Sequence, residues 1–195
     1  MWTKLEDIAE IIRGVSYKKN VSQSFASPGY IPVLRATNIQ ERKLILHDSL
    51  VFVPASIAKE EQYLRPGDSV ICISSGSKHL VGKSAMLRSK WKGAFGAFLA
   101  VVRPASHVDA QFVGYFLNSP QYQDAVRRLS SGININNLRI RDLAKIRLPL
   151  PPLPEQRRIV AKIEALFSRL DAAEEGLRRV QRNLKRYRAA VLKAA

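Results

Sequence analysis

The stretch LPLPPLPEQRRIV, residues 148–160, marks the point where the character of the chain changes. Its prolines predict an extended linker, because proline fixes φ and removes a backbone donor. From this point to the last residue the sequence follows one unbroken helical pattern. We therefore predict a globular domain at 1–148, a proline-rich linker at 149–154 and a long helix at 155–195.

The long helix carries a heptad seam, because apolar and small residues alternate four and three positions apart. The seam residues are Ile159, Ile163, Leu166, Leu170, Ala173, Leu177, Val180, Leu184, Tyr187 and Val191. A helix of about forty residues is roughly 60 Å long, which exceeds the width of a small domain. Most of the seam therefore needs a second helix as its partner.

The charge of the chain is strongly positive, with a net value of +16 and a pI near 10.4. Residues 1–153 hold 21 Lys and Arg against 11 Asp and Glu, and residues 154–195 hold 11 against 5. Both parts are thus basic, at +10 and +6. A folded basic domain most often binds a polyanion, usually nucleic acid. A basic surface that binds nothing is one alternative, and binding to a ribosome or to a membrane surface is another.

Cys72 is the only cysteine, so neither an internal disulfide nor a cysteine-based metal cluster is expected. The N-terminus is acidic where a signal peptide would be basic, and no apolar run approaches twenty residues. We expect a cytoplasmic protein.

The first 148 residues predict an α+β fold with a bent, mostly antiparallel sheet and flanking helices. Thr3 and Glu6 stand at the spacing of a capping box, which favours a short helix over residues 3–12. Asp109 and Ser119 are positioned to cap two later helices. Strands are expected at residues 31–39, 50–54, 69–74, 80–87, 94–104 and 144–151.

The sequence contains no pattern that supports catalysis. His47, His79 and His107 lie far apart and have no accompanying carboxylate pattern. No phosphate-binding loop or dinucleotide fingerprint is present. The carboxylates Asp68 and Asp109 suit turns and helix caps. We expect a protein that is not an enzyme and that holds neither a metal nor a cofactor.

Three polar loops combine small residues, amides and cations, at residues 16–24, 74–79 and 133–141. Small residues let backbone N–H groups approach phosphates, Lys and Arg neutralise phosphates, and polar side chains can contact base edges. Each loop alone is more typical of an ordinary solvated turn. The candidate DNA-binding residues are Lys18, Lys19, Arg35, Asn38, Ser74, Ser75, Ser77, Lys78, His79, Asn134 and Asn136.

Three passages together resemble the specificity subunits of type I restriction–modification systems. They are WTKLEDIAEIIRG (2–14), GDSVICISSGSKHLVGKSAML (67–87) and the region from INNLRIRDL to RYRAAVL (135–192), of which PEQRRIV is the most distinctive part. The resemblance covers essentially the whole chain.

The resemblance implies a non-catalytic subunit that binds one half of a bipartite double-stranded DNA target through a target-recognition domain. Long helices of the family set the gap between the two halves. The partners implied are adenine-methyltransferase subunits, which would carry S-adenosylmethionine, and restriction subunits in a complete complex. A full-length family member has two recognition domains and two helical regions, whereas this chain has one of each, so it resembles a half-length form.

The helix itself favours pairing with a second copy that runs antiparallel. After Glu175 it has seven basic residues and no acidic one, so a parallel pair would set like charges side by side. Ala173 and Gly176 lie near the middle, where small residues allow close crossing. The expected target is a gapped palindrome. Two alternatives remain: a basic coiled-coil adaptor without sequence preference, and a recognition module detached from a fused restriction–methylation enzyme.

Overall fold

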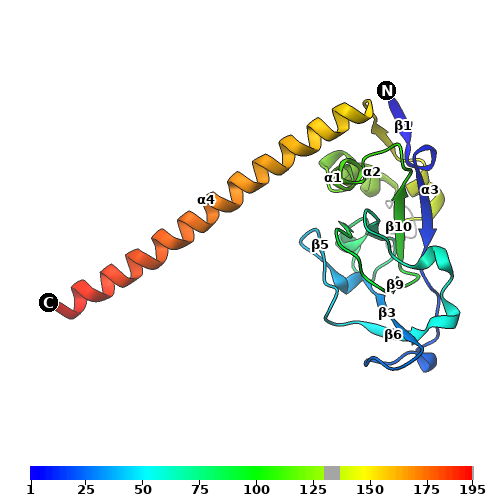
Figure 1. Cartoon of the computed structure of the whole chain (residues 1–195), viewed down its shortest axis with the longest axis horizontal. Coiled ribbons are helices and arrows are strands. Elements are labelled where there is room, and N and C mark those ends of the chain that lie inside the picture. The colour runs from blue at the N-terminus through cyan, green and yellow to red at the C-terminus, as the bar shows by residue number, and fades with distance from the viewer. Residues whose placement is uncertain (130–136, 195) are drawn as a thin grey trace. The chain divides into compact units, whose positions relative to one another are not determined.

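The computed structural model describes residues 1–129 and 137–194, without the side chains of residues 78, 188–191, 193 and 194. The chain divides into two compact units, Met1–Gln156 and Arg157–Ala195. The first contains small sheets and short helices, and the second is a single helix (Figure 1). The predicted α+β class with a long C-terminal helix is confirmed.

The largest sheet of the first unit has four strands in the order β2-β10-β7-β8, and all its neighbours are antiparallel. Its central strands are almost wholly buried, in keeping with the apolar run around Cys72. The Cys72 thiol is buried too, which raises its pKa. The strands are β2 (Ala9–Arg13), β7 (Ser69–Cys72), β8 (Ser84–Met86) and β10 (Leu99–Pro104).

Three smaller sheets are found besides it among the described residues of the unit, so the single bent sheet expected from the sequence is divided. One has the order β6-β3-β9, in which β3 and β9 are parallel, and the other two pair β1 with β11 and β4 with β5. The strands are β1 (Trp2–Lys4), β3 (Tyr30–Leu34), β4 (Ile39–Gln40), β5 (Lys43–Leu44), β6 (Val51–Pro54), β9 (Ala94–Phe95) and β11 (Arg147–Pro149).

The predicted helix over residues 3–12 is wrong. This segment forms β1, one 3₁₀ turn and then β2, whose residues pair with β10 from Ala9 to Arg13. The capping interactions are made by Asp7, which accepts from the Lys4 N–H at 3.1 Å and from the Thr3 hydroxyl at 3.3 Å. Isoleucines are good strand formers, and pairing with a buried strand overrides a weak helical spacing.

Two later expectations also change. The strand expected at 94–104 is interrupted by a turn, so that β9 joins the three-stranded sheet and β10 the four-stranded one. The polar loop expected at residues 133–141 is Asn-rich, and its last two residues belong to the five-residue helix α3 (Ile140–Ala144).

The two predicted helix caps are confirmed. Asp109 accepts from the Phe112 N–H at 2.9 Å and caps α1 (Ala110–Phe116). The Ser119 hydroxyl accepts from the Tyr122 N–H at 3.2 Å at the start of α2 (Pro120–Leu129). Helix α1 packs on β8 and β10, and its residues Phe112, Val113 and Phe116 are buried.

The helix α4 (Leu153–Ala194, 42 residues) begins two residues before the predicted position. Pro154 lies in its first turn, where a missing N–H costs no helical hydrogen bond. The Gln156 side chain is buried within the first unit, where it accepts from the Asp109 N–H at 2.9 Å and donates to the Pro151 carbonyl at 2.8 Å. The proline-rich segment is therefore fixed by specific hydrogen bonds. In the described part of the chain, no helix is both long and apolar enough to cross a membrane.

A buried ion pair links the turn before β7 to β10. The Arg103 guanidinium donates to both oxygens of the Asp68 carboxylate, at 2.8 and 2.7 Å, and also to the carbonyls of Glu61 and Tyr63. Asp68 is only 1% exposed, and it also accepts from the Arg65 N–H. Its hydrogen bond raises the already high pKa of Arg103. Asp68 is thus a turn residue, as predicted, and in addition the anchor of Arg103.

We expect Asp68→Asn to destabilise the first unit by about 3–5 kcal/mol, because it leaves a largely buried guanidinium without its counter-charge. Chemical denaturation would measure the loss. Asp124→Asn is the matched control: Asp124 pairs with Arg127 on the surface, and its loss is expected to cost less than about 1 kcal/mol. Equal effects of the two substitutions would contradict the assigned role of the buried pair.

Candidate nucleic-acid interface

A cleft of about 960 Å³ opens on the first unit where four loop segments meet. The segments follow β2, β3 and β7, and the fourth is the turn between β9 and β10. The polar and aromatic side chains that line the cleft are Arg13, Ser16, Tyr17, Lys19, Ser22, Arg35, Thr37, Ser74, Ser75 and Phe98. Segments that are far apart in the sequence therefore contribute to one surface.

Backbone hydrogen bonds hold these segments together close to two glycines, Gly14 and Gly96. The Val15 N–H donates to the Phe95 carbonyl at 2.7 Å, and the Gly96 N–H donates to the Leu34 carbonyl at 2.9 Å. A Cβ atom added to Gly14 would lie 2.2 Å from the Gly96 carbonyl oxygen. Because real Cβ atoms do not approach backbone so closely, only glycine at position 14 permits this packing.

The cleft is electropositive. Arg13, Lys19 and Arg35 are exposed, and no carboxylate is found among the described residues that line it. The Arg35 guanidinium donates to the Ser49 carbonyl at 3.0 Å, which restricts where its charge can lie. Cations gathered in a concave surface attract polyanions more strongly than the same charges spread over a flat one.

Tyr17 contributes a neutral hydroxyl to this surface. Burial raises the pKa of Tyr17, and the positive charge of Arg35 opposes the shift. The hydroxyl therefore stays protonated at neutral pH and can donate or accept a hydrogen bond.

The structure brings part of the predicted DNA-binding set together. Lys19, Arg35, Ser74 and Ser75 line the cleft, whereas Lys18, Ser77 and His79 are exposed outside its lining. The side chain of Lys78 and the whole of Asn134 and Asn136 lie outside the described residues. Ser74 does form a bridge with Asn137, so the described end of the Asn-rich segment lies beside the cleft.

The prediction that Asn38 contacts DNA is contradicted. Its side chain is 1% exposed. The amide donates to the carbonyls of Ile45 and Asp48, at 3.0 and 2.8 Å, and its oxygen accepts from the Arg35 N–H at 2.9 Å. Asn38 therefore fixes the backbone that presents Arg35. The sequence alone does not distinguish a buried asparagine of this kind from one that faces solvent.

Sequence reasoning missed Arg13, Tyr17, Thr37 and Phe98. Arg13 ends a segment that was expected to be a helix, and Phe98 lies in a turn that was expected to be the middle of a strand. A glycine beside two aromatic residues, as in Phe95-Gly96-Ala97-Phe98, was the available signal of that turn. Within residues 1–129 and 137–194, no group of His, Cys, Asp or Glu suited to a metal ion is found.

The first unit is thus an α+β unit with short loops around a basic cleft, and the second is a long helix with an apolar seam. The chain belongs to the family of type I restriction modification DNA specificity domains, whose model matches residues 1–180.

Two relatives match nearly the whole chain. They are the type I restriction enzyme StySPI specificity subunit of Salmonella potsdam and the EcoKI specificity subunit of Escherichia coli K12, each 40% identical over 188 residues. Each match covers 96% of this chain and 40% of the relative. The chain thus spans 40% of the length of these subunits.

Solved structures show the same fold. A chain from a structure of a type I restriction–modification system has a TM-score of 0.70 at 24% identity, covering 95% of this chain and 43% of that one. The HsdS subunit of Thermoanaerobacter tengcongensis has a TM-score of 0.66 at 21% identity, covering 90% of this chain and 39% of the subunit.

We expect the cleft cations to dominate the affinity of the first unit for polyanions. The variant Arg13→Ala/Lys19→Ala/Arg35→Ala should leave a heparin column at clearly lower salt than the wild type. The control Lys43→Ala/Lys90→Ala/Lys145→Ala removes the same charge from exposed positions outside the cleft. Equal shifts for both variants would show that net charge alone determines binding and that the cleft has no special role.

Proposed function

We propose that this chain is a DNA specificity subunit of a type I restriction–modification system that acts as an antiparallel pair of copies. Each copy binds one half-site of double-stranded DNA through the cleft, and the paired helices set the distance between half-sites. The chain is not itself an enzyme. It positions adenine-methyltransferase subunits, which bind S-adenosylmethionine, and it positions restriction subunits where these are present. The complex acts in the cytoplasm.

The lining of the cleft supports the DNA-binding part of this proposal. Lys19 is a flexible cation suited to a phosphate, whereas Arg35 is held by the Ser49 carbonyl and so is oriented in advance. Ser74 and Ser75 are small and half-buried, which lets a ligand approach the backbone at the end of β7. This combination of positioning cations and short polar groups is typical of surfaces that contact both phosphates and base edges.

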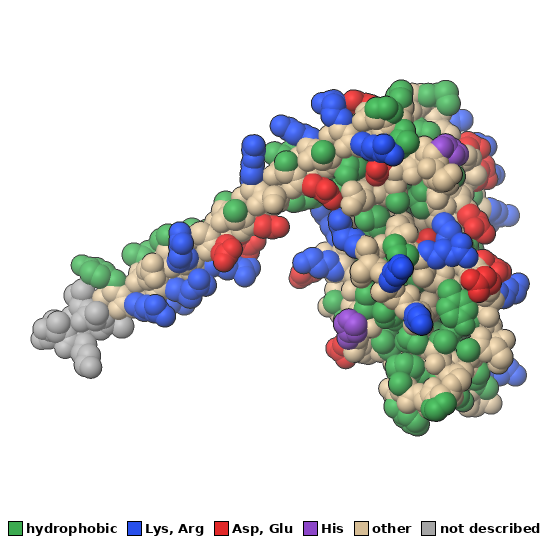
Figure 2. All heavy atoms as spheres, in the orientation of Figure 1, with side chains coloured by type: hydrophobic (Ala, Val, Ile, Leu, Met, Phe, Trp, Pro, Cys, Tyr) green, Lys and Arg blue, Asp and Glu red, His purple; other side chains and the backbone are tan. Residues whose placement is uncertain are grey.

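The observation that carries the proposal of pairing is the exposed seam of α4. Six of its large apolar side chains are between 51% and 71% exposed in the single chain: Leu166, Leu170, Leu177, Val180, Leu184 and Tyr187. In the space-filling view, apolar side chains follow one side of the C-terminal part of the helix and Lys and Arg gather mainly on the other (Figure 2). A seam of this length needs a second helix. Val191, the last predicted seam residue, lies outside the described side chains.

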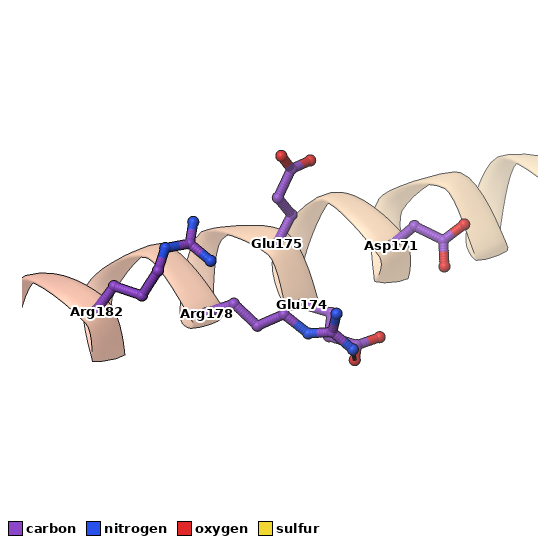
Figure 3. A pocket seen from close by; sticks show the side chains of 5 residues that line it. All are labelled: Asp171, Glu174, Glu175, Arg178 and Arg182. Carbon is purple, nitrogen blue, oxygen red and sulfur yellow. Dashed lines mark hydrogen bonds and ion pairs between the residues drawn. The ribbon is translucent and has the colours of Figure 1, made fainter.

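The distribution of charge favours a second copy in antiparallel orientation. The acidic residues of the second unit end at Glu175, and Arg178 already reaches back to Glu174 in an ion pair of 2.6 Å (Figure 3). Beyond this point seven Lys and Arg residues follow with no carboxylate. An antiparallel partner places its carboxylates along that basic half, whereas a parallel partner places seven more cations there.

The middle of the helix is suited to a two-fold axis. A Cβ atom added to Gly176 would meet nothing within 4 Å, so none of the residues that the structure describes requires glycine there. Glycine inside a helix costs about 1 kcal/mol relative to alanine, which close contact with a partner would explain. An axis at Glu175 sets Leu166 opposite Leu184 of the second copy, and Leu170 opposite Val180.

We expect the double variant Leu166→Cys/Leu184→Cys to form disulfide-linked dimers under mild oxidation, because antiparallel pairing brings the two positions together. Each single variant should stay unlinked, since its two copies of the same position are about 27 Å apart along the helix. The native Cys72 is buried, so the background is low. Non-reducing electrophoresis would measure the products.

Linkage of the single variants would show a parallel pair. A monomer in sedimentation, with no linkage in any variant, would exclude self-pairing through this seam.

The helix length should determine the spacer of the target. Each helix is about 63 Å long and the two-fold axis inverts one half-site relative to the other, so the target is a gapped palindrome. Inserting seven residues after Gly176 keeps the heptad seam and adds about 10.5 Å, equivalent to about three base pairs. The complex with its methyltransferase subunits would be used to select bound duplexes from a random library.

We expect the same half-sites for wild type and insertion variant, with a spacer about three base pairs longer in the variant. A heptad replaced by a different heptad sequence, with no change in length, is the control. An unchanged spacer would refute the helix as a ruler, and a library with no enriched sequence would favour a basic adaptor without sequence preference.

A further inference from the structure

Phe98 is the most prominent aromatic side chain of the cleft. It is 68% exposed and lines the cleft from the turn that joins β9 to β10. The same surface carries the cations Arg13, Lys19 and Arg35. A large apolar ring is unusual on a surface that otherwise presents charges and hydroxyls. Exposed apolar groups among such residues commonly mark a contact with a partner.

The turn is held in place without the help of the Phe98 ring. The Phe98 carbonyl accepts from the N–H groups of Ile73 and Ser74, at 2.9 and 3.2 Å. The Ala97 N–H donates to the Val15 carbonyl and the Leu99 N–H to the Gly96 carbonyl, at 2.9 and 2.8 Å. The backbone therefore fixes the point from which the ring projects, while the ring contributes little to the fold.

A rigidly placed apolar ring can contribute to recognition of DNA in two ways. It can contact the methyl group of thymine, which is the apolar feature of the major groove, or it can enter between base pairs as a wedge. A wedge must protrude from the protein surface. Phe98 lines a cleft from a short turn between two strands, which favours the groove contact.

We propose that Phe98 is a specificity-determining residue that contacts a thymine methyl group in the half-site bound by this cleft. This inference rests on the proposed function, because it requires the cleft to bind double-stranded DNA. The cations attract DNA, and Phe98 provides a further contact that distinguishes one base from the others. The cations alone provide attraction with little preference among sequences.

The experiment combines a protein substitution with a DNA substitution. The probe is the duplex selected by the complex with its methyltransferase subunits, in which each thymine of the half-site is replaced in turn by deoxyuridine. When deoxyuridine replaces one particular thymine, the affinity of wild type for the duplex should fall about fourfold, which corresponds to the free energy of burying one methyl group. Phe98→Ala should bind the thymine and deoxyuridine duplexes equally well, with the same thermal stability as wild type.

Phe25→Ala is the matched control, because Phe25 is 64% exposed on the same unit but does not line the cleft. It should keep the fourfold preference. A preference that persists in Phe98→Ala, or no thymine at which wild type responds, would refute the role of Phe98 while leaving DNA binding intact. A wild-type complex that selects no duplex would instead overturn the proposed function, and the inference with it.

Discussion

The apolar seam of α4 is the constraint on which the account of this protein depends. Residues such as Leu170 and Leu184 are about 60% exposed in the single chain, on a helix of 42 residues. Apolar side chains in a heptad series gain stability only when another helix covers them. In the proposed pairing, these charges favour a second copy that runs antiparallel, because the basic half beyond Glu175 then lies against a half that contains carboxylates.

The first unit depends on a different kind of contact, the close approach of backbone segments. Gly14 lies so near the carbonyl of Gly96 that any side chain at position 14 would force the two backbone segments apart. This contact brings the loops after β2, β3 and β7 to one cleft, together with the turn that carries Phe98. Asn38 and the ion pair of Arg103 with Asp68 hold the surrounding backbone. The side chains that face the cleft can therefore differ without loss of the fold, which suits the role in DNA recognition that is proposed for this surface.

The sequence predicted the features that depend on local patterns and missed those that depend on distant contacts. The end of the proline-rich linker placed the start of α4 within two residues, and the caps at Asp109 and Ser119 were found because each cap is a local interaction. The N-terminal strands were mistaken for a helix, since only pairing with β10 shows that the isoleucines belong to a sheet. Lys19 and Arg35, which line the cleft, were among the candidates taken from the sequence, whereas Phe98 required knowledge that a turn divides its strand.

The chain spans 40% of the length of its curated relatives, so the symmetry of its DNA target is the property that most directly distinguishes a self-paired subunit from a piece of a two-domain one. Two copies related by a two-fold axis present identical clefts in opposite directions. The decisive measurement is the sequencing of methylated adenines in the genome of a host that carries this chain with its methyltransferase subunits. Antiparallel pairing of two copies predicts one gapped palindromic motif with identical, inverted half-sites. Two half-sites of unrelated sequence would contradict it.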